Sequence, residues 1–274
     1  MVGTPIGNLG DLSERARVTL DAVDLVAAED VRRTRGLLTS IAISARLISF
    51  NEGNERERTE RLLEQLRAGR DVAVVSAAGM PGLSDPGFRL VRACADAGIV
   101  VRVVPGPSAV VSALVVSGLP TDRFAFEGFL PRRAGERRER LAALASEPRT
   151  IVLFESPRRL VATLRDVVAA LGDRRVAVCR ELTKLHEEVL RGAASEVLAR
   201  MEAREVRGEI VVVVDGAPKQ AAVPAPEDLA AEARDLVAGG LRPREAARSV
   251  AGRHGASAND VYRALLERGG PTSR

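Results

Sequence analysis

The chain has 274 residues, 46% of them apolar, which is enough for two domains of ordinary size, each with its own core. Its apolar runs are short or interrupted by charge, whereas a membrane-spanning helix needs about 20 apolar residues, so the pattern excludes a membrane protein and makes the cytoplasm the expected compartment. The net charge is +4, and almost all cations are arginine, whose flat guanidinium suits phosphate and therefore permits RNA binding without proving it.

The first half of the chain alternates between helical and strand patterns. Helices are expected over residues 13–21, 31–39, 55–68 and 88–97, and strands over 25–28, 71–76 and 99–104. The strands are continuous apolar runs, which is typical of strands that helices cover on both faces. This alternation predicts a largely parallel sheet, and such sheets bind ligands at the carboxyl ends of their strands. The loops 76–86 and 105–109 fall at such ends.

A turn-forming segment, 117–122, is the expected boundary to a second α/β domain. Beyond it, strands are expected over 123–128, 150–154, 175–179 and 209–214, and helices over 157–171 and 195–202. Residues 218–226 have the composition of a linker, and residues 229–239 and 243–266 follow as helices without strands. The pattern thus predicts an α/β protein with two α/β domains, 1–117 and 122–217, and a helical tail, 226–270.

Two loops have the chemistry of a ligand site. Pro105-Gly106-Pro107-Ser108-Ala109 follows a strand and opens a helix, so its free N–H groups could receive a polar or anionic group. The alternative is a tight turn in which Ser108 caps the helix. The loop from Ser76 to Gly87 is rich in small residues, so a ligand could lie against its backbone.

Seven ordered motifs carry more information than either loop alone. They are Thr4-Pro5-Ile6-Gly7-Asn8-Leu9, Ala28-Glu29-Asp30 with Arg32, Ser84-Asp85-Pro86-Gly87, the 105–109 loop, Phe126-Glu127-Gly128-Phe129-Leu130-Pro131, Phe154-Glu155-Ser156-Pro157 and Arg180-Glu181-Leu182-Thr183-Lys184. In this order the chain closely resembles the ribosomal RNA small subunit methyltransferase I family of the tetrapyrrole-methylase-like superfamily.

The resemblance implies a homodimer of two-domain α/β chains that hold S-adenosyl-L-methionine in the cleft between the domains. It also implies 2′-O-methylation of a cytidine in the decoding region of 16S rRNA, within the small ribosomal subunit, and it requires no metal. Carried onto matching positions, it places the cofactor against Gly79, Met80, Leu83, Ser108, Ala109, Glu127, Gly128, Leu182, Thr183 and Glu209.

A ribose hydroxyl is a poor nucleophile, and a nearby base or cation would help it to lose its proton. The expected catalytic residues are Lys184, Glu155 and Asp30, with Glu29 as a further candidate. Lys184 stands out because lysine is so scarce, although it could instead form a surface ion pair with Glu187 or Glu188. The two histidines, His186 and His254, lie far apart in the sequence and are interpreted as structural or surface groups.

Arginines supply the expected RNA contacts. They are Arg32, which follows the Glu29-Asp30 motif, and Arg132, Arg133, Arg137 and Arg138, which follow the motif ending at Pro131. The alternative for this stretch is a solvated loop and helix start. The tail resembles a helix-turn-helix that could approach nucleic acid, but a helical bundle that merely packs or dimerises fits the same spacing.

The first cofactor loop departs from the family pattern. Where the family usually has Ser-Asp-Ala-Gly-Thr-Pro, this chain has Ser76-Ala77-Ala78-Gly79-Met80-Pro81, so an acidic group and a hydroxyl are absent. Two rival functions therefore stay open. One is methylation of a tetrapyrrole or another small molecule, and the other is RNA binding without a cofactor.

Overall fold

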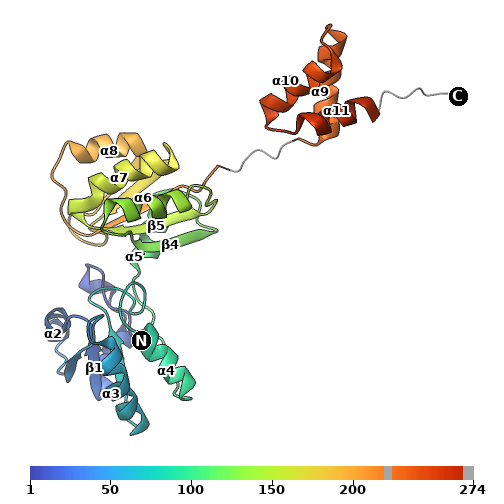
Figure 1. Ribbon diagram of the computed structural model, residues 1–274. Helices are drawn as coiled ribbons and strands as arrows, with labels where there is room; N and C mark the ends of the chain where they lie inside the picture. Colours follow the sequence, from blue (N-terminus) through green and yellow to red (C-terminus); the bar gives the residue numbers. More distant parts are fainter. Residues whose placement is uncertain (219–223, 268–274) are drawn as a thin grey trace. The chain divides into compact units, whose positions relative to one another are not determined.

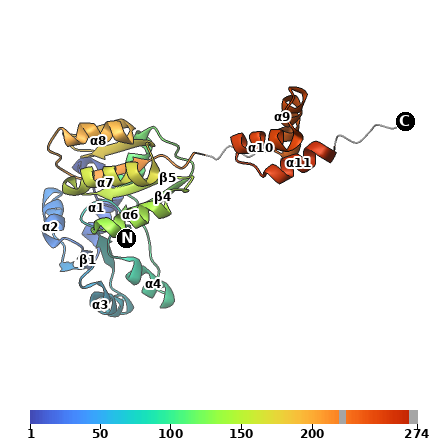
Figure 2. The same ribbon diagram turned by 45° about the horizontal axis from the view of Figure 1, so that its top comes forward.

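The computed structural model describes residues 1–218 and 224–267 (Figures 1 and 2). The chain forms two compact units, Met1–Ala217 and Pro218–Arg274. In the described ranges, every helix is too short or too polar to cross a membrane.

The first part of unit 1 holds a parallel three-stranded sheet in the order β2-β1-β3. Its elements are the short 3-10 helix Leu9–Asp11, α1 (Glu14–Ala22), β1 (Leu25–Ala28), α2 (Val31–Ser40), β2 (Leu47–Ser49), α3 (Glu55–Arg67), β3 (Val72–Val75) and α4 (Phe88–Asp96). Side chains alternate between the two faces of the sheet. Val26 and Ala28 pack with α1 and α2, and Leu25 and Ala27 pack with α3 and α4. Burial on both faces explains why the central strands read as continuous apolar runs.

In this first part the structure differs from the expected strands at two places. Residues 99–104 form no strand: they contribute only a bridge from Val104 to Val2, and Val100 is 77% exposed. This run has the composition of a buried strand but only Met1–Gly3 as a pairing partner. Conversely, β2 is a strand that the pattern did not reveal, since three half-buried residues are too few to show a period.

The second part of unit 1 holds a five-stranded sheet in the order β4-β5-β8-β6-β7. Its elements are α5 (Ala109–Ser117), β4 (Phe124–Phe129), α6 (Ala134–Ala143), β5 (Thr150–Glu155), α7 (Pro157–Leu171), β6 (Arg175–Arg180), β7 (Glu188–Ala193), α8 (Ala194–Glu202) and β8 (Ile210–Val214). Unlike the first sheet, this sheet is mostly antiparallel. Only β4 and β5 pair in parallel, because β8 inserts antiparallel between β5 and β6, and β7 forms a hairpin with β6.

Helices cover both faces of this sheet. Leu141 of α6, Leu160 of α7 and Val197 of α8 pack on one face, and Val110 and Leu114 of α5 pack on the other. Helix α5 precedes the expected boundary at residue 117, yet it packs on the second sheet. This arrangement places the 105–109 loop at the junction between the two sheets.

Unit 2 contains α9 (Pro226–Ala238), α10 (Pro243–His254) and α11 (Ala258–Glu267) around a small core of its own. Gly255 ends α10 in the left-handed conformation (φ 65°), as helix ends favour. The short turn to α11 is compatible with a helix-turn-helix and with a plain bundle. Residues 219–223 of the expected linker and residues 268–270 of the expected tail lie outside the described residues.

Candidate active site

A cavity of about 420 Å³, hereafter the first cavity, lies among loops of both sheets. Its walls come from the 77–85 loop, the start of α5, the ends of β4 and β5, and strands β6 and β8. Most of the residues that the family resemblance assigns to the cofactor line this cavity, namely Gly79, Met80, Leu83, Ser108, Ala109, Leu182 and Glu209. Sequence motifs far apart in the chain therefore meet at one site.

Backbone contacts hold these loops in place. The N–H of Thr4 donates to the carbonyl of Gly79 at 2.9 Å, and Gly79 returns a hydrogen bond to Thr4 at 3.1 Å. A Cβ on Gly106 would lie 2.9 Å from the Gly3 backbone, so glycine is needed for the close approach of these segments. The hydroxyl of Ser108 accepts from the N–H of Val111. Ser108 therefore caps α5 and also lines the cavity, which combines the two alternatives.

The other expected cofactor residues are not part of the lining. Glu127 forms an ion pair with Arg140 at 2.6 Å. Gly128 lies in a left-handed turn beside Ser84, with φ 61°. The hydroxyl of Thr183 accepts from the N–H of Asn8 at 3.1 Å, and so joins the loop before β7 to the first loop of the chain. Assigning a cofactor contact to these three has no support from the cavity geometry.

Asp85 is the carboxyl group most altered by this cavity. Its partial burial and the negative charge of Glu29, which lines the same cavity, raise the pKa of Asp85 to about 7, although the Ser76 hydroxyl acts in the opposite direction. A carboxyl group with this pKa exchanges protons readily near neutral pH, as a general base must. The sequence motif contained Asp85, but no role was predicted for it. Its position, just after a predicted cofactor loop at the end of a strand, could have identified it as a candidate catalytic residue.

Two of the expected catalytic carboxylates serve the fold. Asp30 caps α2 by accepting from the N–H groups of Arg32 and Arg33 at 2.9 and 3.0 Å. The side chain of Glu155 is fully buried, and its oxygens accept from the N–H of Ser156 at 2.7 Å and from the Thr163 hydroxyl at 2.6 Å. Glu155 reaches the cavity wall, but these donors make it an anchor for the start of α7.

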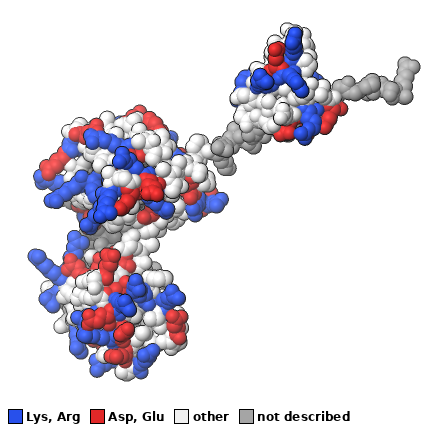
Figure 3. Space-filling view, in the orientation of Figure 1, with Lys and Arg blue, Asp and Glu red and all other residues white. Residues whose placement is uncertain are grey.

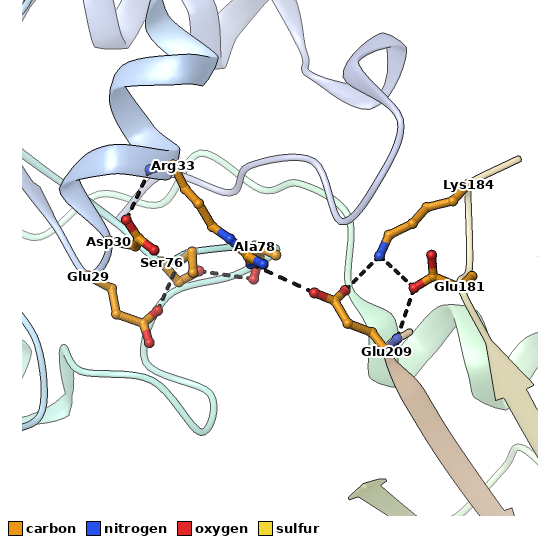
Figure 4. Close-up of polar contacts among 9 residues, drawn as sticks. Glu29, Asp30, Arg33, Ser76, Ala78, Glu181, Lys184 and Glu209 are labelled. Atoms are coloured by element: carbon orange, nitrogen blue, oxygen red, sulfur yellow. Dashed lines mark hydrogen bonds and ion pairs between the residues drawn. The ribbon is translucent and has the colours of Figure 1, made fainter. Parts of the chain in front are cut away.

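Lys184 belongs to a charge network at the mouth of the cavity (Figure 4). Its ammonium lies 2.8 Å from Glu181 and 3.2 Å from Glu209, and Glu209 in turn faces the Arg33 guanidinium at 3.7 Å. The alternative pair with Glu187 or Glu188 is thus not the one formed. Burial acts to lower the pKa of Lys184, but the hydrogen bonds to Glu181 and Glu209 outweigh it and raise that pKa. These contacts favour the charged form of Lys184, which supports a role as a cation over a role as a base.

The expected RNA-binding arginines separate into two groups. Arg32, Arg132, Arg133 and Arg138 are exposed. Figure 3 shows Lys and Arg side chains mixed with Asp and Glu over the visible face of unit 1. Arg137 is a correction to that set: its side chain is 8% exposed, and it pairs with Asp166 of α7 at 2.7 Å. The 3.6-residue period of α6 turns this one arginine toward the core. Arg137 therefore joins α6 to α7 and is not available to a phosphate.

In the described ranges, no three His, Cys, Asp or Glu side chains are grouped so that they could hold a metal ion. Arg33 is a further wall residue for which no role was predicted, although its neighbour Arg32 was assigned to RNA. Consecutive residues of a helix point in different directions, so α2 turns only one of these two adjacent arginines toward the cavity, and composition could not distinguish them.

Comparison with known proteins identifies the family of this chain. The family described as Tetrapyrrole (Corrin/Porphyrin) Methylases matches residues 1–198. A Ribosomal RNA small subunit methyltransferase I from Thermotoga maritima is 52% identical over 79% of this chain and 97% of its own length. One from Mycobacterium tuberculosis is 49% identical over 98% of this chain and 95% of its own.

A solved structure has the same fold at low identity. It is a uroporphyrin-III C-methyltransferase from Thermus thermophilus complexed with S-adenyl homocysteine, with a TM-score of 0.56, 21% identity, and coverage of 78% of this chain and 95% of that one. Because the matching relatives share about half their residues with this chain over most of its length, the chain belongs to the ribosomal RNA small subunit methyltransferase I family of the tetrapyrrole methylases.

Proposed function

We propose that this protein is a methyltransferase that uses S-adenosyl-L-methionine to methylate the ribose 2′-hydroxyl of a cytidine in the decoding region of 16S rRNA. The observation that carries the proposal is the first cavity, where the cofactor loops predicted from the sequence meet beside Asp85, a carboxyl group whose pKa is raised to about 7. Family membership supplies the acceptor class, since the relatives are named for the small-subunit ribosomal RNA.

The cavity fits the cofactor in charge and in shape. S-adenosyl-L-methionine is cationic at its sulfonium and its ammonium, and the cavity wall carries Glu29, Asp85, Glu155 and Glu209 against the single guanidinium of Arg33. The N-terminus of α5, next to Ser108, suits the cofactor's carboxylate because helix N-termini favour anions. A volume of about 420 Å³ lies within the range of small-ligand sites.

When bound, the cofactor supplies an electrophilic methyl group on sulfur. Asp85 accepts the proton of the 2′-hydroxyl as the oxygen forms its bond to that methyl carbon. In that same displacement the methyl group would leave the sulfur, and the bonding electron pair would stay on sulfur. Lys184 keeps its proton and holds Glu209 and Glu181 in position. Alignment of hydroxyl and methyl supplies much of the rate, as in other reactions of two bound groups.

Exposed arginines support RNA as the acceptor over a tetrapyrrole. Arg132, Arg133 and Arg138 follow β4, whose last residue, Phe129, lines the cavity. Phosphate contacts position a nucleic acid without reading its sequence, which is the role proposed for these side chains and for Arg32. By family resemblance we also propose that the protein acts as a homodimer on the small subunit.

Loss of cofactor binding is the second candidate, because Ala77 replaces the usual acid. The N–H of Ala77 donates to the Glu29 carboxylate at 2.8 Å, so backbone alone keeps this loop beside Glu29. Because this hydrogen bond holds the loop without a carboxylate at position 77, we favour the enzyme.

Methyl transfer to small ribosomal subunits isolated from a strain that lacks the relative's gene tests the proposal. Radiolabelled S-adenosyl-L-methionine and nucleoside mass spectrometry should reveal 2′-O-methylcytidine, with Asp85→Asn as the inactive control. Label in another nucleoside would correct the acceptor. Binding of RNA with no heat from S-adenosyl-L-methionine in calorimetry would establish the second candidate instead.

A further inference from the structure

A second cavity of about 430 Å³ adjoins the first. Its walls come from the 4–9 loop, from α2, from the start of the 76–87 loop and from Lys184. The two cavities share five wall residues, which are Ile6, Arg33, Ala77, Ala78 and Glu209. A group bound in the second cavity would therefore lie next to whatever occupies the first.

Small residues shape this second cavity. A Cβ on Gly7 would lie 2.8 Å from the Thr183 hydroxyl and would also clash with the Lys184 side chain. Glycine at position 7 thus lets the 4–9 loop close against Lys184. On the opposite wall, a Cβ at Gly36 of α2 would have no atom within 4 Å. The 4–9 loop is a prominent sequence motif that lines the first cavity only through Ile6. Most of its residues line the second cavity.

Two cations border the second cavity. Arg33 reaches Glu209 at only 3.7 Å and its side chain is 59% exposed, so most of its donors face solvent. Lys184 is held more tightly, between Glu181 and Glu209. In Figure 4 Glu209 lies between these two cations, from α2 on one side and the 181–184 loop on the other. Guanidinium and ammonium groups at a cavity rim suit the phosphates of a nucleic acid strand.

We propose that the second cavity binds the acceptor nucleoside of the RNA. The ribose lies at the shared wall, with its 2′-hydroxyl toward the first cavity, and Arg33 binds a flanking phosphate. A nucleoside taken out of its stack needs a pocket of its own beside the reactive group of the cofactor. This inference rests on the proposed function, and it adds which residues receive the acceptor.

Blocking the cavity from Gly36 tests the inference. Gly36→Leu projects a side chain into the open space, and leucine favours a helix more than glycine does, so the fold should tolerate it. Gly252→Leu in α10, where an added Cβ is also free of contacts, is the matched control. We expect Gly36→Leu to raise the KM for RNA at least tenfold, with the Kd for S-adenosyl-L-methionine and the Tm unchanged, and Gly252→Leu to match the wild type.

A second pair of variants tests the phosphate contact without filling the cavity. Arg33→Ala should weaken RNA binding and reduce its logarithmic salt slope by roughly 0.7 to 0.9, the value for one phosphate contact, whereas Arg35→Ala, exposed on the same helix, should not. Equal KM values for the two leucine variants would overturn the inference, as would an equal loss of cofactor affinity in Gly36→Leu, which would assign the cavity to the cofactor. A wild-type protein that methylates no RNA would instead refute the proposed function itself.

Discussion

Two carboxylates in the wall of the first cavity show how environment divides one chemistry into two roles. Glu155, at the junction of β5 and α7, accepts hydrogen bonds from Ser156 and Thr163 and pairs with Arg159 at 3.3 Å. Asp85, in the loop before α4, faces a second carboxylate, and its pKa rises to about 7. Burial and the like charge of Glu29 raise the pKa of Asp85 because both disfavour its charged form. Both acids occur in sequence motifs, but Glu155 holds the start of α7 in place, whereas Asp85 is the proposed proton acceptor.

The largest expected effect comes from removing the proton acceptor. Asp85→Asn keeps the size of the side chain but cannot take the hydroxyl proton, and general-base catalysis contributes roughly 10²- to 10⁴-fold. We expect kcat to fall by at least 100-fold, while the Tm stays within a few degrees of the wild-type value and the Kd for S-adenosyl-L-methionine rises at most a few-fold, because one acidic wall group is lost. A kcat above one tenth of the wild-type value would show that positioning alone drives the reaction.

The pH profile sharpens the same contrast. Asp85 must be ionised to act as a base, and its pKa is about 7, so kcat/KM should rise about tenfold per pH unit below that value and level off above it. The contribution to stability has the opposite sign. Because the folded pKa is raised, ionisation favours the unfolded state once the pH exceeds the ordinary value, near 4, and this cost grows until about pH 7. Asp85→Asn should remove both dependences, which parallel pH series of rate and Tm would show.

Glu155 should respond in stability and not in rate. Glu155→Gln leaves at least one buried donor badly matched, and an unsatisfied buried donor costs about 1 to 3 kcal/mol of unfolding free energy. Urea denaturation should therefore shift to lower concentration, while turnover per folded molecule stays within about threefold. Thr163→Val, which removes one donor from the same carboxylate, is the companion variant. An unchanged midpoint with a 100-fold loss of turnover would return Glu155 to the catalytic set.

The sequence predicted what depends on local periodicity. Helix α7 and strand β1 begin and end where the apolar pattern begins and ends. Pairing partners were less accessible, because β8 differs little in composition from a parallel central strand and yet runs antiparallel to both neighbours. The strand predicted over residues 99–104 is absent for the same reason. A run rich in valine favours a buried strand, but whether it is buried depends on the segments that pack and pair with it.

For the site, the motifs located the loops but not the roles. Gly79, Ser108 and Leu182 meet at one cavity as expected, since loops at strand ends converge. Which donors a carboxylate such as Asp85 or Glu155 receives depends on how the folded chain places side chains such as that of Thr163, and no spacing rule reports that. Among the candidate catalytic residues, the sequence singled out Lys184 because lysine is scarce in this chain. Its environment in the structure favours its charged form.

The arginines in and just before α6 also divide into a structural residue and proposed RNA contacts. Arg137→Ala breaks a largely buried ion pair with Asp166, and losing one partner of such a pair costs about 3 to 5 kcal/mol. RNA affinity of the folded protein should not change. Arg132→Ala, Arg133→Ala and Arg138→Ala together should leave the Tm nearly constant and reduce the salt slope of RNA binding by roughly 0.7 to 0.9 for each phosphate that the protein no longer neutralises. Thermal melts and salt titrations of both proteins measure this, and a stable Arg137→Ala with weak RNA binding would place Arg137 at the interface after all.

The smallest effect is expected where this chain lacks the acid that its family usually carries. Ala77 lies between the two cavities, with its N–H on the Glu29 carboxylate, so Ala77→Asp adds a third negative charge near Glu29 and Asp85. A like charge disfavours ionisation, so the pKa of Asp85 should rise by roughly one unit or less. The midpoint of the kcat/KM profile should move upward by that amount, and the affinity for the cationic cofactor should increase a few-fold because the added charge is opposite. Ala143→Asp, exposed on α6, adds the same charge away from the cavity and should change neither quantity. If the two variants share one pH profile and one Kd for S-adenosyl-L-methionine, position 77 does not govern the Asp85 environment, and the acid usual in the family serves some other purpose.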